Sequence, residues 1–312
     1  MSRNIFENPN NKKRKMKKNV KRAFLLMVAC LVIFGCANKV KAYVDETIKE
    51  KQEQKVAEQK RLAEEARKKK EAEEAKKKIV GVKHGAESYS YSAKKVAEKL
   101  KSGDYSNNGQ KIVFLTFDDG TSTTVTPEVL KVLDKENVKA TFFLTGQNIE
   151  RGGDKAKELI KQEFNAGHAI ANHSYSHDYG ILYPNRVLNL DSFKADFKKT
   201  DDILKQVLGP HFSTEVIRCP GGHMSWKGME PLDQYLAQNH MASIDWNALS
   251  GDAEGKKKNP EELYNYAVKS AEGKEMVVVL MHDTYSKENT AKALPQIIKY
   301  FKDNGYQFKV LV

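Results

Sequence analysis

The sequence predicts an α/β protein whose largest domain is an irregular (β/α)7 barrel. Two observations support this fold class. From residue 111 onward, short and almost continuously apolar runs alternate with longer segments of helical spacing. Runs such as 112–117 (IVFLTF) are typical of parallel strands that are buried on both faces. About seven such strand–helix units within roughly 200 residues favour a barrel over an open sheet.

The expected elements follow one another closely along the chain. The first strand is followed by a helix that begins beside Pro127, a residue that suits the first turn of a helix. In a barrel of this kind the chemistry collects at the C-terminal ends of the strands, so polar residues are sought there. We expect strands at 112–117, 140–145, 169–172, 216–218, 242–245, 276–281 and 307–312, and helices at 126–135, 154–166, 191–208, 261–271 and 289–302.

The positive charge of the chain is concentrated at its N-terminus. The 312 residues carry a formal net charge of +12, of which +10 lies in residues 1–42 and +2 in residues 43–78. Residues 79–312 contain 30 basic and 30 acidic side chains and are therefore neutral. A basic nucleic-acid-binding domain is excluded as the default interpretation, and we expect no nucleic-acid partner.

Residues 1–42 have the pattern of an export signal. A basic run at 12–22 precedes an apolar run at 23–37, which is short for a membrane span. Three fates remain open: an uncleaved signal anchor in the cytoplasmic membrane, cleavage after Ala42, or lipidation at Cys36. All three predict that the remainder of the chain is extracytoplasmic, either membrane-anchored or secreted to the cell wall.

The exported part is expected to begin with a spacer. Residues 43–80 are rich in Lys, Glu, Ala and Gln, and pairs such as Glu64/Lys68 have the i,i+4 order that stabilises a helix. We interpret this segment as a charged helical stalk and residues 81–110 as a linker to the domain at 111–312. Cys219 is the only cysteine after residue 42, so no intrachain disulfide is expected there.

Two of the predicted strands end in groups typical of a metal site. Asp118 and Asp119 follow the first strand, and two adjacent carboxylates at a buried strand end are costly unless a cation or a proton lies between them. His173 and His177 follow the third strand at a spacing that lets both imidazoles reach one metal ion from a helical turn. Two histidines and one carboxylate leave a position open for water, as in catalytic zinc sites.

The next three strand ends also carry polar clusters. Arg218-Cys219-Pro220-Gly221-Gly222 offers an arginine that can bind a carboxylate and glycines that let backbone N–H groups approach a substrate. Asp245-Trp246 and Asp252 follow the fifth strand, and Leu280-Met281-His282-Asp283 ends the sixth. Polar clusters at five of the first six strand ends are not a core pattern, and they indicate an active site.

These five clusters resemble the motifs of the NodB-homology polysaccharide deacetylases, carbohydrate esterase family 4, over residues 111–312. The resemblance implies an irregular seven-stranded βα barrel and metal-dependent removal of acetyl groups, mostly N-acetyl, from a polysaccharide. It implies metal ligands at Asp119, His173 and His177, a catalytic base at Asp118 oriented by Arg218, and a catalytic acid at His282 paired with Asp252. The backbone N–H of Gly221 is expected to bind the oxyanion, and Leu280 and Trp246 to line the substrate pocket.

The sequence departs from the family pattern at two motifs. The third usually reads Arg-Pro-Pro-aromatic-Gly, but here Cys219 replaces a proline and Gly221 replaces the aromatic residue, which removes one wall of the sugar site. In the fourth motif the aspartate is usually followed by tryptophan, whereas Asp252 precedes alanine. Asp245, which precedes Trp246, is therefore an alternative partner for His282.

The combined expectation is a monomeric, wall-facing hydrolase that removes N-acetyl groups from N-acetylglucosamine residues of peptidoglycan and releases acetate. It would use one divalent metal ion, zinc in the first place, with cobalt, nickel or manganese as alternatives. Its partners would be the glycan strand and, through the N-terminal segment, the cytoplasmic membrane. Alternative substrates are an exopolysaccharide, a chitin oligomer or acetylxylan. An alternative of another class is a non-catalytic glycan-binding surface protein.

Overall fold

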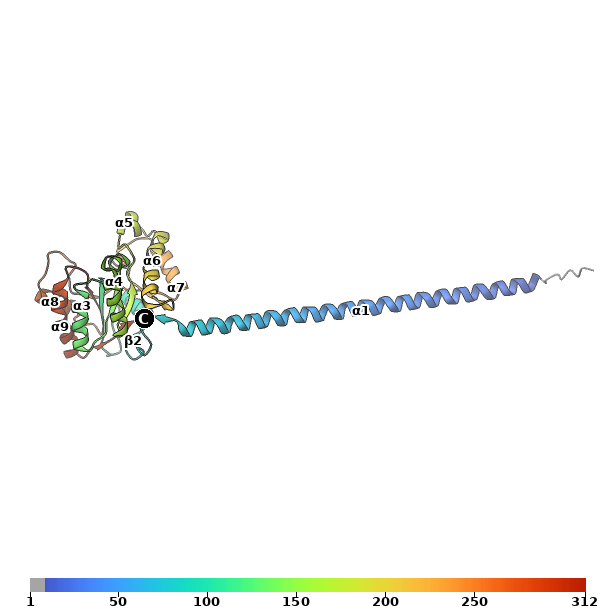
Figure 1. Cartoon of the computed structure of the whole chain (residues 1–312), viewed down its shortest axis with the longest axis horizontal. Coiled ribbons are helices and arrows are strands. Elements are labelled where there is room, and N and C mark those ends of the chain that lie inside the picture. The colour runs from blue at the N-terminus through green and yellow to red at the C-terminus, as the bar shows by residue number, and fades with distance from the viewer. Residues whose placement is uncertain (1–8) are drawn as a thin grey trace, which may run out of the picture. The chain divides into compact units, whose positions relative to one another are not determined.

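The computed structural model describes residues 9–312 of the chain (Figure 1). The chain divides into two units at Lys76, and each unit is described by itself. The part of the first unit that the structure describes is helical, and the second unit contains every strand found in the described residues.

The described part of the first unit consists of helix α1 (Pro9–Lys77), whose last residue belongs to the second unit. No glycine or proline occurs between residues 43 and 78, so nothing in that stretch interrupts the helix, and Lys68 contacts Glu64 at 2.8 Å. The large apolar side chains of α1 that the structure describes are exposed, as at Leu26 and Phe34. Among the described residues, α1 is the one helix long and apolar enough to cross a membrane, a property that secretory signals near an N-terminus share.

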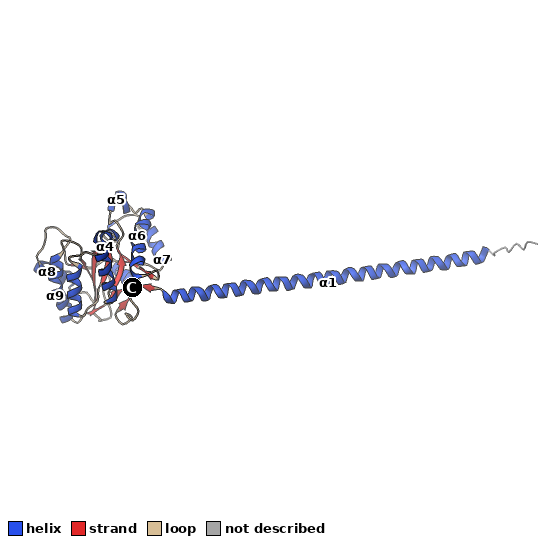
Figure 2. Ribbon diagram, viewed as in Figure 1, coloured by secondary structure: helices blue, strands red, loops and turns tan. Residues whose placement is uncertain are grey.

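The second unit is built around a parallel sheet with the strand order β8-β7-β5-β4-β3-β10-β9. Figure 2 shows these strands enclosed by helices. β11 pairs with the first residues of β3, and β4 pairs with the last ones. The strands of this sheet are β3 (Ile112–Gly120), β4 (Thr141–Leu144), β5 (Ala169–Asn172), β7 (Val216–Ile217), β8 (Ala242–Ser243), β9 (Ala248–Leu249), β10 (Met276–His282) and β11 (Gln307–Phe308).

The sheet is curled, although β8 and β9 at its two edges do not pair with each other. Only residues 244–247 separate these two strands, so their near ends lie within about 18 Å of each other. In a flat sheet of seven strands the edges would be about 29 Å apart. The predicted α/β class is confirmed, and the expected barrel has the form of a curled, incompletely closed sheet.

The helices and short ribbons around the sheet agree only partly with expectation. Helix α7 was not expected, and α4 begins before the expected start at residue 154, with an irregular residue at Gly153. The helices are α2 (Ala93–Ser102), α3 (Thr126–Glu136), α4 (Gly146–Asn165), α5 (Tyr179–Leu182), α6 (Leu190–Leu208), α7 (Glu230–Gln238), α8 (Pro260–Ala271) and α9 (Glu288–Asp303), with 3-10 turns η1 (Pro184–Arg186) and η2 (His223–Ser225). The ribbons pair β1 (Ile79–Val80) with β6 (Phe212–Ser213) and β2 (Ser90–Tyr91) with β12 (Val310–Leu311).

Residues 81–110, which we expected to be a linker, carry β2 and α2 and are folded against the domain. Ser92 accepts a hydrogen bond at the N-terminus of α2, and Gly103 ends the helix with a φ of 70°. Val96 is fully buried among side chains that include Phe114 and Phe143 of the sheet. The small apolar residues of α2 recur at helical spacing. The linker interpretation was based on the composition of residues 81–110, which does not show this spacing.

The core fills both faces of the central strands. In β3, Val113 and Leu115 belong to one buried cluster, and Phe114 between them belongs to another. Residues 276–279 of β10 alternate between the same two clusters. This two-sided burial explains why the strands are almost continuously apolar, and it leaves the strand ends as the place for polar groups.

Candidate active site

Two adjacent aspartates lie where β3 ends. The parallel pairing with β10 brings His282 opposite Asp118. Asp119 has a φ of 62°, and the pairing of β3 with β4 shifts register between Asp118 and Gly120. Such a bulge redirects side chains, so that both carboxylates face the same neighbour. Nε2 of His173 lies 3.5 Å from Asp118 Oδ2 and 3.7 Å from Asp119 Oδ1.

His173 and His177 follow β5 on a bend, not on the helical turn expected from their spacing. Ser174 and His177 have φ angles of 71° and 52°, which a helix does not allow. Asp196 of α6 holds the bend, because its Oδ1 accepts hydrogen bonds from the backbone N–H of Tyr175 at 2.7 Å and of the next residue at 3.0 Å. The bend places the two imidazole centroids 5.0 Å apart.

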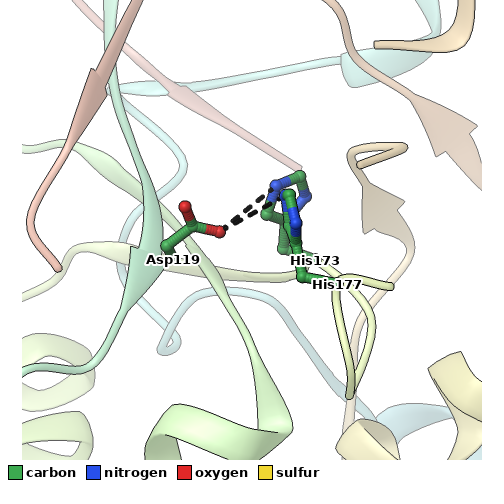
Figure 3. A group of neighbouring side chains, drawn as sticks. All are labelled: Asp119, His173 and His177. Atoms are coloured by element: carbon green, nitrogen blue, oxygen red, sulfur yellow. Dashed lines mark ion pairs between the residues drawn. The ribbon is translucent and has the colours of Figure 1, made fainter. Parts of the chain in front are cut away.

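Asp119, His173 and His177 form a group with the donor set of a metal site (Figure 3). One ligand atom from each lies within 4.8 Å of the others, and Asp119 Oδ1 is 3.6 Å from Nε2 of His177. Nδ1 of His173 contacts the Arg218 carbonyl at 2.8 Å, so as a donor there it leaves the Nε2 lone pair free. Burial, with the neighbouring His177, lowers the pKa of His173 to about 3 and keeps the ring neutral. Asp119 Oδ1 is buried without a hydrogen-bond partner among the described residues, so the group fits a divalent cation.

Arg218 is fully buried and orients Asp118. Its guanidinium contacts Asp118 Oδ1 at 2.6 Å and donates to Thr116 Oγ1 at 2.9 Å. Two further hydrogen bonds to the carbonyls of Ile244 and Asp245 fix the plane of the guanidinium. Burial raises the pKa of Asp118 above its ordinary value, and the charge of Arg218 opposes that rise. The pair thus presents a desolvated carboxylate held in one orientation.

His282 lies at the end of β10 in contact with Asp252. Asp252 Oδ1 is 2.8 Å from His282 Nδ1, and Oδ2 accepts a hydrogen bond from Thr290 Oγ1 at 2.8 Å. Burial lowers the pKa of His282, but the hydrogen bond and charge of Asp252, with Asp118 and Asp119 nearby, outweigh burial and raise it to about 9. His282 can therefore carry a proton near neutral pH, with Nε2 4.0 Å from Asp119 Oδ2.

Asp245, the alternative partner of His282, binds backbone groups instead. Its carboxylate accepts hydrogen bonds from the N–H groups of His223 at 2.8 Å and Met224 at 3.3 Å. The structure therefore brings Asp252 to His282 and uses Asp245 to hold the loop that follows the third motif.

Comparison with known proteins identifies the family of the chain. Residues 105–234 match the polysaccharide deacetylase family. A Bacillus cereus protein named peptidoglycan-N-acetylglucosamine deacetylase is 30% identical over 214 residues, which cover 66% of this chain and 71% of that protein. The chain belongs to the polysaccharide deacetylase family. The sequence-based identification of the family is thereby confirmed.

Solved structures place this polysaccharide deacetylase among proteins of the same fold. A Streptococcus mutans CE4 esterase is 42% identical, with a TM-score of 0.68 over 75% of this chain and 96% of that one. The catalytic domain of a peptidoglycan N-acetylglucosamine deacetylase from Eubacterium rectale is 34% identical, with a TM-score of 0.57 over 67% and 92% of the two chains. The predicted fold class is confirmed by these likenesses.

The residues expected to line the deacetylase substrate pocket lie around the same strand ends. Leu280 is two positions before His282 on β10 and so faces the same side of the strand. The Trp246 ring lies 5.7 Å from the Arg218 guanidinium. Gly221 has a φ of 76°, a conformation that favours glycine.

Sequence reasoning missed several polar residues that hold the candidate site in place. Asn148 Nδ2 donates to the carbonyl of Asp119 at 2.8 Å, and Thr116 Oγ1 both accepts from Arg218 and donates to a β10 carbonyl. Asp196 holds the histidine bend from α6. Thr116 lies inside the first predicted strand, and helix residues such as Asn148 and Asp196 have no local pattern that distinguishes them from solvated ones.

Proposed function

We propose that the chain hydrolyses the N-acetyl groups of N-acetylglucosamine residues in cell-wall peptidoglycan and releases acetate. The observation that carries the proposal is that two paired groups adjoin the Asp119, His173 and His177 group. The Asp118 carboxylate, bound by Arg218, lies 3.5 Å from His173. The His282 imidazole, bound by Asp252, lies 4.0 Å from Asp119. Amide hydrolysis needs a base for water and an acid for the leaving nitrogen, and these two pairs have the matching chemistry.

Asp119, His173 and His177 would hold one divalent ion, for which we propose zinc, with cobalt, nickel and manganese as alternatives. When bound, the ion supplies Lewis acidity, which polarises the acetyl carbonyl and acidifies the attacking water. His173 contributes a neutral nitrogen whose direction is fixed by the Arg218 carbonyl.

Asp118 is the proposed base that takes a proton from the attacking water. Its carboxylate is nearly inaccessible to bulk solvent, and the raised pKa that burial causes makes it a better proton acceptor than an exposed aspartate. Arg218 positions Asp118 through the 2.6 Å contact and keeps enough opposite charge beside it for the ionised form to persist.

His282 is the proposed acid that gives a proton to the departing nitrogen. Asp252 holds Nδ1 and so directs the protonated Nε2 toward the site. Without that proton the amine would leave as an amide anion, which is a very poor leaving group. The backbone N–H of Gly221 would stabilise the oxyanion, while Leu280 and Trp246 would line the pocket that receives the N-acetyl group.

The compartment follows from the same proposal. Relatives from Bacillus cereus are named for peptidoglycan, and α1 carries a segment apolar enough for a signal or an anchor. We propose that residues 1–42 direct export or anchor the chain in the cytoplasmic membrane and that residues 43–80 act as a stalk. The catalytic domain, a monomer in this proposal, would then act on the glycan strand outside the cytoplasm.

Acetate release tests the substrate. The purified full chain, with zinc added, is incubated with peptidoglycan, chitin oligomers and acetylxylan, and free acetate is measured. We expect acetate from peptidoglycan together with new glucosamine residues in the muropeptides. Acetate release from acetylxylan alone would show that the substrate is acetylxylan and not peptidoglycan. Glycan binding without release of acetate from any substrate would favour a non-catalytic glycan-binding protein, an alternative that no observation at the candidate site supports.

A further inference from the structure

Gly221 lies against two aromatic side chains that come from other parts of the chain. A Cβ atom at this position would be 3.0 Å from Cζ2 of Trp226 and 3.3 Å from the hydroxyl oxygen of Tyr179. The two aromatic residues therefore occupy the space into which a side chain at position 221 would extend. We call Tyr179 and Trp226 the aromatic wall.

The aromatic wall adjoins the candidate metal group. The Tyr179 ring lies 5.4 Å from the imidazole of His177 and 5.0 Å from the Trp226 ring, measured between centroids. Tyr179 nevertheless has an exposed fraction of 45%, so a large part of its surface is free to contact a ligand. A tyrosine in this position presents an apolar ring and a polar hydroxyl to whatever enters the site.

Buried neighbours hold the wall in place. Trp226 stacks on Tyr183 with centroids 4.1 Å apart and an interplanar angle of 9°, and its Nε1 donates to the Pro220 carbonyl at 2.9 Å. Tyr183 is only 2% exposed. Asp178 caps α5 by accepting from the N–H of residue 180 at 2.7 Å, which fixes the helical turn that begins with Tyr179.

Tyr179 also belongs to an exposed apolar surface. In the described part of the second unit, five large apolar side chains are exposed, and four of them lie on the two segments 179–187 and 223–227. These segments are joined by a bridge between Val187 and Lys227. Exposure alone does not select a ligand-binding residue among these four side chains, whereas contact with the candidate site does. The four are Tyr179, Ile181, Val187 and Met224, of which only Tyr179 contacts both Gly221 and the His177 ring.

We propose that the aromatic wall is a sugar-binding subsite, in which Tyr179 contacts the apolar face of a pyranose ring and Trp226 supports it. A pyranose offers C–H groups on its faces and hydroxyls at its rim, which matches a half-exposed tyrosine whose ring lies beside His177 and whose hydroxyl lies beside Gly221. The ligand class, an N-acetylglucosamine residue of a glycan, rests on the proposed function. The aromatic side chains of this subsite come from residues 179 and 226. The sugar can therefore contact an aromatic ring although residue 221 is a glycine.

Binding tests the subsite without turnover. The full chain carrying Asp118→Asn is titrated with an N-acetylglucosamine tetramer in a calorimeter, alone and combined with Tyr179→Ala, Tyr179→Phe or Ile181→Ala. We expect Tyr179→Ala to raise the Kd roughly tenfold, and Tyr179→Phe, which keeps the ring, to stay within about twofold of the parent. Ile181 is 47% exposed on the same short helix but lies outside the wall, so Ile181→Ala is the matched control and should leave the Kd unchanged.

The outcomes separate the subsite from the proposed function. An unchanged Kd for Tyr179→Ala, an equal loss in Ile181→Ala, or no binding by the parent overturns the subsite. Failure of the proposed function shows separately, as absence of acetate release by the wild-type chain from every acetylated glycan. Metal content, measured in each variant by mass spectrometry, should equal that of the parent and excludes an effect through His177.

Discussion

Asp252 contacts His282 through both of its carboxylate oxygens. Oδ1 lies 2.8 Å from Nδ1 of the imidazole, and Oδ2 accepts a hydrogen bond from the backbone N–H of the same residue at 2.8 Å. Thr290 donates a further hydrogen bond to Oδ2. The aspartate therefore fixes the position of the backbone and the direction of the ring together, which is more than a single side-chain contact would achieve.

Replacing Asp252 tests whether this contact supports acid catalysis. Asp252→Asn preserves the shape but removes the negative charge that stabilises protonated His282. We expect kcat for acetate release to fall roughly 100-fold or more, because general acid catalysis contributes about 10²–10⁴-fold. KM and metal content should change little, since Asp252 is in contact neither with the metal group nor with the aromatic wall.

Asp245→Asn is the control for that experiment, because the sequence alone allowed either Asp245 or Asp252 to be the partner of His282. Asp245 accepts hydrogen bonds from two backbone N–H groups in the loop after Gly222. We expect a modest loss of stability and a kcat within about threefold of the wild type. A larger loss of kcat in Asp245→Asn than in Asp252→Asn would reverse the assignment.

The sequence indicated the polar residues of the candidate site more clearly than the residues around them, for a physical reason. Asp118 and His282 are polar residues that follow an apolar run, so the ends of these strands can be recognised from the neighbouring sequence alone. The partner of His282 could not be chosen from spacing, because it depends on how the loop after β9 folds back toward β10. The bend at His173 was mistaken for a helical turn because the residue that holds it, Asp196, is distant in the sequence.

In the fold, too, the features with a local sequence pattern were predicted, and those that depend on distant contacts were not. Two-sided burial made β3 and β10 recognisable from composition. The short strands β7 and β8 were also expected, but β9, which contains only two residues, carries little pattern and was not expected. The curl of the sheet follows from the short connection between its two edge strands, β8 and β9. It depends on the order in which the strands pair, which cannot be predicted from any one segment of the sequence. The folding of α2 against the sheet was missed because small residues such as Ala93 form its buried face.

Replacement of His177 should remove metal and activity together. His177→Ala leaves Asp119 and His173 as two ligands, too few for a stable catalytic site. We expect the metal bound per chain to fall to background and acetate release to be lost, measured by mass spectrometry of the metal and by acetate assay. Chelation of the wild-type chain should have the same effect and should be reversed by added zinc.

His223→Ala serves as the histidine control. His223 lies near the site, but its Nε2 contacts Asp233 at 2.7 Å, and it is no member of the metal group. Metal content should therefore equal that of the wild type. Retention of metal by His177→Ala would refute the ligand assignment, whereas loss of metal in His223→Ala would show that the group extends beyond three residues.

Arg218 is expected to tolerate no conservative change. Arg218→Lys keeps the charge, but lysine cannot reproduce the planar set of contacts to Asp118, Thr116 and the Ile244 carbonyl. We expect kcat to fall at least tenfold and stability to drop by about 1–3 kcal/mol, because a buried acceptor loses its partner. Arg186→Lys, an exposed arginine over Trp226, is the matched control and should change stability little. Full activity in Arg218→Lys would mean that Asp118 needs no orientation.

Glu163 predicts how stability depends on pH. It is fully buried on α4, and neither carboxylate oxygen has a hydrogen-bond partner among the described residues. Burial, with the charge of Asp283, raises its pKa well above 4.5, so the folded chain keeps this group protonated where the unfolded chain releases the proton. The folded state therefore binds more protons, and stability falls as the pH rises above 4.5 toward the folded pKa. The loss is about 1.4 kcal/mol for each pH unit in that interval.

Glu163→Gln removes this ionisation while keeping the size of the side chain. We expect the variant to melt several degrees above the wild type at pH 8 and within about one degree of it at pH 4.5, since roughly 2–4 °C accompany each kcal/mol in a domain of this size. Glu158→Gln, at an exposed position on the same helix, should show no such dependence on pH. Melting followed by circular dichroism at several pH values measures the difference. A Glu163→Gln variant less stable than the wild type at pH 8 would show that the carboxylate is ionised and compensated inside the fold.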